Sequence, residues 1–238
     1  MGRQDSFTLN SSHTESTYSI HVTLPNNYSS SEVYETIYTL DGNWYFDHVS
    51  EESFRISEQK SKQNEIVVGI NHADRRMIDY APTPTNEGEG GAANFTRFIN
   101  EELIPYIEEH FQADTTRKSR AILGHSAGGL YAAYLFTNQN DLFANYFMLS
   151  PAIWYDDGVL LQYERDNRSK NELSEQTVFI SKAELEPTQL FMNIFHDRLE
   201  MYDQISLGFY TVKGKQHASS AKPAITEALK FYYSLKEK

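Results

Sequence analysis

The stretch GHSAGG, residues 124–129, places Ser126 between glycines two positions before and two positions after it. This spacing matches G-x-S-x-G, in which a nucleophilic serine sits on a sharp turn between a strand and a helix. The context agrees, because apolar residues 121–123 precede the turn and an apolar helical pattern, residues 127–139, follows it. The pattern predicts that Ser126 is a nucleophile. The alternative is a serine without a catalytic role in a glycine-rich turn.

A serine nucleophile needs a general base, and His217 occupies the place where that base is expected. It lies between the last predicted strand and the last predicted helix, after the serine in chain order. Five of the eight histidines lie well before the serine, and His196 falls in a predicted helix. His125 is too close to Ser126 in sequence to reach round to it. His217 is therefore the predicted base, and a solvated loop histidine is the alternative.

The acid that orients the base should follow the preceding strand, residues 176–181. Glu186 and Glu184 both lie just after that strand, and Asp197 lies further on. We predict Glu186 as the acid and keep Glu184 as the second candidate. If both are solvated loop carboxylates, the site works as a serine–histidine dyad.

Two backbone N–H groups should stabilise the oxyanion of an acyl-transfer reaction. One is the N–H of Ala127, directly after the nucleophile. The other is expected in the loop DGNW, residues 41–44, where we predict the N–H of Asn43. The alternative for that loop is a simple Asp-Gly turn.

These residues sit at the ends of alternating strands and helices, which indicate an α/β fold with a mostly parallel sheet covered on both faces. The first strand or two are expected as antiparallel edges. The predicted strands cover residues 17–25, 35–42, 64–70, 119–126, 145–154, 176–181 and 205–214. The predicted helices cover residues 46–59, 94–111, 127–139, 191–205 and 222–235.

Two interruptions stand out in this pattern. Pro105 lies inside the helical pattern 94–111 and should kink the helix or split it in two. Residues 71–91 form a long predicted loop, and such loops are usually functional or disordered. We expect a polar N-terminal segment, residues 1–16, followed by a single domain, residues 17–238.

The composition narrows the classes of function. The chain of 238 residues has a net charge of −12, so binding to nucleic acid is not expected. It has no cysteine, which excludes disulfides and thiolate metal sites. No apolar run approaches the length of a membrane span, and the polar N-terminus does not have the pattern of a signal peptide. Cytoplasm and periplasm both stay open, and we expect a monomer or weak homodimer.

Several stretches resemble the esterase D-like "putative esterase" family of α/β-hydrolases, which includes siderophore and feruloyl esterases. They cover most of residues 17–235, and they are TIYTLDGNWYF (36–46), RRMIDYAPTP (75–84), FINEELIPYIEEHF (98–111), AILGHSAGGLYAAYLF (121–136), FANYFMLSPAIWYDDG (143–158) and the loop of His217. The resemblance implies an α/β-hydrolase fold without a large cap domain, and no cofactor or metal. It places the nucleophile on Ser126, the base on His217 and the second oxyanion donor on Asn43. Ala183 stands where the family commonly has a glycine before its acid.

Position in the sequence suggests which residues line the substrate pocket. Trp154 follows the strand next to the elbow, and Trp44 lies beside the oxyanion loop. Arg76 and Tyr80 lie in the long loop, and His125 is adjacent to the nucleophile. Aromatic walls suit phenolic or sugar esters, and Arg76 could meet an anionic group or pair with Asp79.

The leading hypothesis is a serine carboxyl-ester hydrolase acting on a small-molecule ester through an acyl-enzyme on Ser126. An acyltransferase of the same fold is the nearest rival. A non-catalytic binding protein on a hydrolase scaffold is the alternative from a different class.

Overall fold

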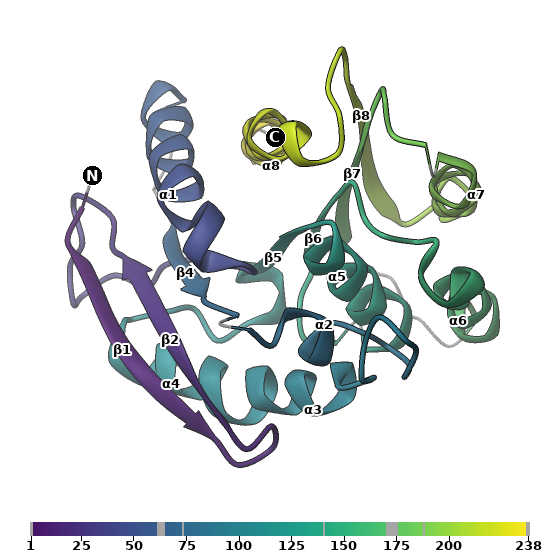
Figure 1. Cartoon of the computed structure of the whole chain (residues 1–238). Helices are drawn as coiled ribbons and strands as arrows, with labels where there is room; N and C mark the ends of the chain where they lie inside the picture. Colours follow the sequence, from purple (N-terminus) through teal and green to yellow (C-terminus); the bar gives the residue numbers. More distant parts are fainter. Residues whose placement is uncertain are drawn as a thin grey trace.

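A single sheet of eight strands runs through the part of the chain that the computed structural model describes, which is residues 2–60, 65–72, 74–139, 141–169, 176–187 and 189–236 (Figure 1). The strand order is β1-β2-β4-β3-β5-β6-β7-β8. The strands are β1 (Gln4–Ser11), β2 (Ser16–Thr23), β3 (Thr36–Thr39), β4 (Ile66–Ile70), β5 (Arg120–His125), β6 (Asn145–Leu149), β7 (Gln176–Ala183) and β8 (Ile205–Val212). Strands β3 to β8 pair in parallel, while β2 pairs antiparallel with both β1 and β4. The predicted mostly parallel sheet is confirmed.

Helices cover both faces of this sheet, as the alternating pattern predicted (Figure 1). They are α1 (Gly42–Gln59), α2 (Arg76–Asp79), α3 (Ala92–Arg97), α4 (Ile104–His110), α5 (Ala127–Asn138), α6 (Val159–Asn167), α7 (Gln189–Leu199) and α8 (Ala221–Leu235). Helices α1 and α8 pack on one face, and α3, α4 and α5 pack on the other. The two faces therefore have separate apolar clusters, with the sheet between them.

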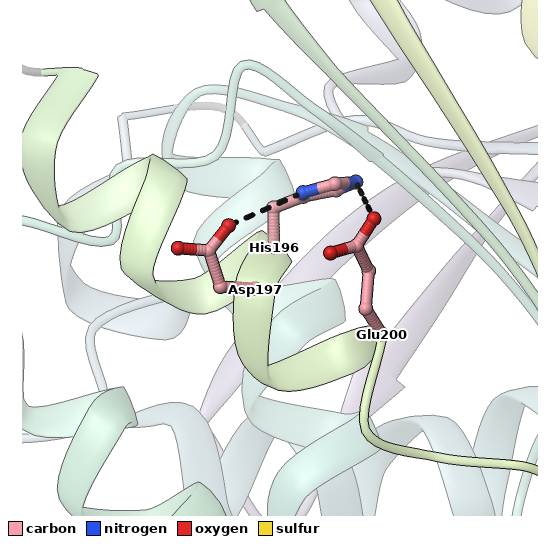
Figure 2. Close-up of side chains that lie close together, drawn as sticks. All are labelled: His196, Asp197 and Glu200. Carbon is pink, nitrogen blue, oxygen red and sulfur yellow. Dashed lines mark ion pairs between the residues drawn. The ribbon is translucent and has the colours of Figure 1, made fainter.

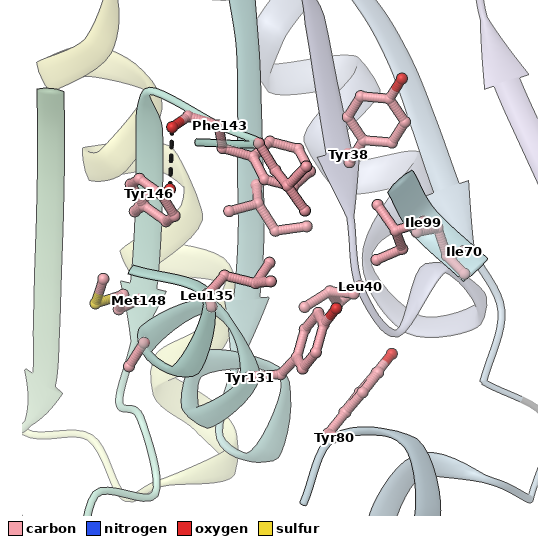
Figure 3. Close-up of a cluster of buried hydrophobic side chains, with 14 of the residues drawn as sticks. Tyr38, Leu40, Ile70, Tyr80, Ile99, Tyr131, Leu135, Phe143, Tyr146 and Met148 are labelled. Atoms are coloured by element: carbon pink, nitrogen blue, oxygen red, sulfur yellow. Dashed lines mark hydrogen bonds between the residues drawn. The ribbon is translucent and has the colours of Figure 1, made fainter. Parts of the chain in front are cut away.

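The two clusters together explain why β4 is a continuous apolar run. All five residues of β4 are buried, as expected for a parallel strand covered on both faces. Figure 3 shows aromatic side chains filling the space between the sheet and α5, among them Tyr38, Tyr131 and Tyr146. The hydroxyl of Tyr146 donates to the carbonyl oxygen of Phe143 at 3.0 Å, which satisfies this polar group inside the core.

The predicted helix over 94–111 is interrupted as Pro105 requires. It consists of α3, a π-helical segment (Phe98–Leu103) and α4, with Pro105 in the first turn of α4. Proline has no N–H to donate, and its ring collides with the carbonyl group four residues earlier in an α-helix. The wider π turn just before it accommodates the proline while the apolar side chains stay on the face against the core.

The predicted N-terminal segment, residues 1–16, contains a strand. Strand β1, which lies inside the expected polar N-terminal segment, pairs with β2 from Gln4↔Thr23 to Ser11↔Ser16. Its side chains alternate between exposed and partly buried, so the polar composition concealed an edge strand. Asn64, where one predicted strand begins, and residues 170–175 lie outside the described residues.

Two further boundaries affect the site. The predicted helix 46–59 begins earlier, at Gly42, so the predicted oxyanion loop is the first turn of α1. The predicted loop 71–91 contains the short helix α2. Among the described residues, no helix combines the length and apolarity that crossing a bilayer requires.

Candidate active site

Ser126 sits on a strained turn between β5 and α5. Its backbone has φ 60° and ψ −117°, a conformation that residues with a side chain rarely adopt. The N–H of Ser126 donates to the carbonyl oxygen of Leu149 at 2.9 Å, which anchors the turn to the neighbouring strand. A Cβ atom at Gly124 would lie 2.3 Å from the backbone of Gly128, so both glycines are explained by close approach of the chain.

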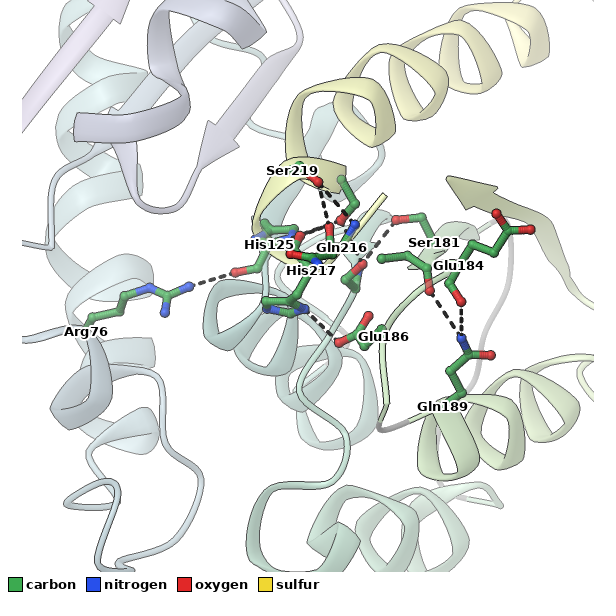
Figure 4. Close-up of polar contacts among 12 residues, drawn as sticks. Arg76, His125, Ser181, Glu184, Glu186, Gln189, Gln216, His217 and Ser219 are labelled. Atoms are coloured by element: carbon green, nitrogen blue, oxygen red, sulfur yellow. Dashed lines mark hydrogen bonds and ion pairs between the residues drawn. The ribbon is translucent and has the colours of Figure 1, made fainter. Parts of the chain in front are cut away.

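His217 and Glu186 come together from the loops that follow β8 and β7. The Nδ1 atom of His217 lies 2.7 Å from Oε1 of Glu186 (Figure 4). The histidine side chain is 37% exposed and the carboxylate 10% exposed, so the acid is shielded while the base stays accessible. Since the ionised carboxylate can only accept, Nδ1 donates to it and Nε2 is left to accept a proton.

Glu184, the second candidate acid, has a different contact. Its Oε2 accepts a hydrogen bond from the N–H of Gly214 at 2.7 Å. Gly214 has φ 66° and begins the turn that leads to His217. Glu184 therefore supports the backbone of the base-bearing loop, and Glu186 is the carboxylate that contacts the imidazole.

In contrast to His217 and Glu186, the described side chains of Ser126 and His217 are not joined by a hydrogen bond. Within the residues described, the Oγ atom of Ser126 makes no hydrogen bond, although the side chain is partly exposed. Hydrogen bonds between a nucleophile and its base are often long in a protein without substrate and tighten in the complex.

The two predicted oxyanion donors lie at the starts of two neighbouring helices. Ala127 is the first residue of α5, and Asn43 is in the first turn of α1. N–H groups in a first helical turn have no partner within the helix. The N–H of Leu40 donates to the carbonyl oxygen of Leu123 at 2.9 Å, and a Cβ at Gly128 would lie 3.2 Å from Asp41. These contacts bring the two helix starts side by side.

Arg76 connects these two helix starts from α2. Its Nε lies 2.9 Å and 3.0 Å from the two carboxylate oxygens of Asp41, and its Nη2 donates to the carbonyl oxygen of His125 at 2.9 Å (Figure 4). Burial raises the pKa of the Asp41 carboxyl, and the neighbouring guanidinium opposes that shift. The predicted pair of Arg76 with Asp79 is wrong, because Arg75 makes that contact at 3.0 Å. Arg76 therefore holds the elbow, and its contact with substrate stays a prediction.

Tyr80 and His125, which were predicted to contact substrate, are also turned inward. Tyr80 is fully buried in the aromatic cluster, and its hydroxyl accepts from the N–H of Asp41 at 3.2 Å. The ring of His125 is buried and contacts Tyr45 and the backbone of His217. Burial, followed by the nearby His217 and Arg76, lowers the pKa of His125 to about 3.

The two tryptophans are placed differently. Trp44 is 53% exposed beside the start of α1, and its ring lies 5.3 Å from the Arg76 guanidinium carbon and edge-on to His72. Trp154 is partly buried against the core, in the segment after β6. That segment is held to the elbow, since the N–H of Ala152 donates to the carbonyl oxygen of Ser126 at 3.2 Å. Both rings remain candidates for substrate contact.

Sequence reasoning missed Asp41 and Tyr45 as parts of the site's support. Asp41 was assigned to a turn, although it has φ 53°, is fully buried and anchors Arg76. Its place as the first residue of the predicted oxyanion loop was the available signal. Tyr45 lies one turn into α1, and nothing in its neighbourhood of the sequence pointed to His125.

Among the described residues, one group of three potential metal ligands lies apart from the candidate site, on α7 and directly after its last residue (Figure 2). His196 Nδ1 is 3.8 Å from Asp197 and its Nε2 is 3.9 Å from Glu200, and both carboxylates are exposed. Pairs of this kind are common on a solvated helix face.

The fold and the turn at Ser126 define the class of the protein, an α/β-hydrolase. The chain belongs to the family described as "Putative esterase", whose family model matches residues 11–191. Membership in this family makes the protein a carboxylic ester hydrolase for small-molecule esters.

Curated relatives and solved structures resemble this chain over most of its length. The chain is 26% identical over 255 residues to the ferri-bacillibactin esterase BesA of Bacillus subtilis, covering 94% of this chain and 87% of that protein. The crystal structure of the BES protein from Bacillus cereus is 28% identical, with a TM-score of 0.87 and coverage of 97% and 95%. An IroE-like serine hydrolase from Shewanella oneidensis is 25% identical, with a TM-score of 0.87 and coverage of 98% and 80%.

Proposed function

We propose that the protein hydrolyses esters through a covalent acyl-enzyme on Ser126, with His217 as general base and Glu186 as the acid that orients it. The observation that carries this proposal is the 2.7 Å contact between His217 Nδ1 and Glu186, on loops at the same edge of the sheet as the strained Ser126. A serine on such a turn, a histidine with Nε2 available and a shielded carboxylate are the parts that acyl transfer needs.

The reaction then has two balanced stages. His217 Nε2 takes the Ser126 Oγ proton as Oγ bonds to the ester carbonyl carbon, and the alcohol leaves with that proton. Water next gives a proton to Nε2 and attacks the acyl carbon, which releases the acid and restores Ser126. In both stages the N–H groups of Ala127 and Asn43 donate to the oxyanion.

We further propose a siderophore ester as the substrate. The relative that matches 94% of this chain is named for a ferri-siderophore, and the family's ester chemistry suits cleavage of such a ligand. Trp44, exposed beside the oxyanion donors, and Trp154, held to the elbow, offer aromatic surface for a ring-bearing substrate.

The test is a panel of p-nitrophenyl esters, feruloyl esters, acetylated sugars and catecholate siderophore esters, assayed with wild type and Ser126→Ala. We expect the siderophore esters to have the highest kcat/KM, and the variant to lose activity by a factor on the order of 10⁴ or more. Ser234→Ala, on α8, is the matched control and should match wild type. Turnover by Ser126→Ala at the wild-type rate would exclude the acyl-enzyme. A preference for feruloyl or acetyl-sugar esters would exclude the siderophore assignment alone.

A further inference from the structure

The residue before the nucleophile contacts the residue proposed as the base. Nε2 of His125 lies 3.1 Å from the backbone oxygen of His217, and the centroids of the two rings are 4.8 Å apart (Figure 4). On the other side of the His125 ring, Nδ1 lies 3.3 Å from the hydroxyl of Tyr45 on α1. One buried ring therefore joins the elbow, the loop of the base and the first turns of α1.

These partners determine where the proton on His125 lies. A backbone carbonyl oxygen can only accept, so Nε2 carries the hydrogen and donates it to His217. Nδ1 is then the acceptor, and the hydroxyl of Tyr45 donates to it. Because burial keeps this imidazole neutral above about pH 3, the ring holds a single tautomer throughout the neutral range.

The loop of His217 depends on such contacts. Residues 213–216, which lead into it, are exposed. The backbone oxygen of His217 accepts from His125 and from the hydroxyl of Ser220, the latter at 2.7 Å. His125 also has its own carbonyl oxygen held by Arg76, so its backbone is tied to the oxyanion side of the site.

We propose that His125, supported by Tyr45, is a positioning residue that fixes the distance between the nucleophile and the general base. This inference rests on the proposed roles of Ser126 and His217. The backbone of His125 leads directly into Ser126, while its ring holds the backbone of His217. Displacing a catalytic group by about 1 Å can slow a reaction on the order of 100-fold.

The test compares His125→Leu, which removes both polar contacts, with His125→Gln, whose amide nitrogen can donate from near the position of Nε2. For wild type and each variant, we measure ester turnover and the rate of labelling by a fluorophosphonate probe. We expect kcat of His125→Leu to fall on the order of 10- to 100-fold while KM stays near wild type. His125→Gln should recover most of kcat, and Tyr45→Phe should lose a smaller part. Tyr202→Phe, a tyrosine hydrogen-bonded to Glu164 away from the site, is the matched control for Tyr45.

The outcomes separate the two proposals. If wild type hydrolyses esters and Ser126→Ala does not, yet His125→Leu keeps wild-type kcat, the positioning role is overturned and the proposed function stands. Equal losses in the Leu and Gln variants, both folded, would show that the ring acts by packing alone and would also overturn it. If neither His125 variant folds, Tyr45→Phe decides, because wild-type kcat and labelling in that variant would overturn the role. Ester turnover that survives in Ser126→Ala overturns the proposed function itself.

Discussion

The two ends of the parallel strands are built on different principles. At the carboxyl ends, three residues that are not glycine have positive φ, namely Asp41 after β3, Ser126 after β5 and Ser150 after β6. At the amino ends, Glu35 and Glu65 precede β3 and β4, and Lys236 lies 2.6 Å from each of them. The carboxyl ends have three such residues beside the candidate site, while the amino ends, where Gln112 has φ 51°, are closed by ion pairs.

This difference indicates where the fold tolerates strained backbone conformations. Backbone in a rarely populated conformation costs on the order of 1–3 kcal/mol and persists only where the surroundings impose it. At the carboxyl end these surroundings are buried hydrogen bonds to Asp41 and to the ring of His125. At the amino end, Lys236 joins the end of α8 to the start of β4, which adds stability away from the candidate site.

In the comparison of the two ends, the largest effect should come from the acid at the carboxyl end. Glu186→Gln removes the charge that orients and stabilises a protonated His217, so kcat should fall roughly 10²- to 10⁴-fold. Steady-state kinetics with a p-nitrophenyl ester measure this loss. Glu184→Gln is the matched control, since its side-chain oxygen can still accept from Gly214 and kcat should stay near wild type. Full activity in Glu186→Gln would instead support a serine–histidine dyad.

A smaller effect, on stability alone, is expected at the amino end. Lys236→Ala leaves Glu65, whose side chain is only 2% exposed, without its cation. Breaking a buried ion pair costs about 3–5 kcal/mol, and Lys236 is 23% exposed, so we expect a loss of about 2–3 kcal/mol in the free energy of unfolding. Urea denaturation measures the loss, and kcat/KM should not change.

Lys230→Ala on the same helix is the control for Lys236→Ala. Lys230 pairs with Glu227 at 2.7 Å on the exposed surface, and such a pair contributes about 0.5 kcal/mol or less. A decrease in kcat/KM for Lys236→Ala would contradict the separation between the two ends.

The smallest effect is a pH dependence at the carboxyl end. The pKa of His125 is about 3 in the folded protein and near its ordinary value of 6.5 when unfolded. Below pH 6.5 the unfolded chain therefore binds a proton that the folded chain does not, so stability falls as the pH falls. His125→Gln lacks this contribution. The stability difference between wild type and variant should shift by about 1.4 kcal/mol in favour of the variant between pH 7.5 and 5.5.

Urea denaturation at several pH values across that range tests this. Parallel pH curves for wild type and His125→Gln would mean that His125 is not held neutral by burial. In that case, burial of the His125 imidazole would not lower the stability of the folded protein at low pH.

Much of the architecture follows from local patterns. The alternating strands and helices, the split helix at Pro105 and the turn at Ser126 were predictable, because period, proline chemistry and close-packed glycines act within a few residues. The edge strand β1 was not, because a polar strand that faces solvent leaves no apolar alternation to detect.

The sequence by itself determined which residue types stand at the ends of which strands: a serine after β5, glutamates after β7 and a histidine after β8. Only the tertiary structure decided that Glu186 contacts His217 while Glu184 supports Gly214, and that Arg76, Tyr80 and His125 turn inward. The physical reason is that these partners lie 30 or more residues apart, and their contacts depend on how separate loops meet at one edge of the sheet.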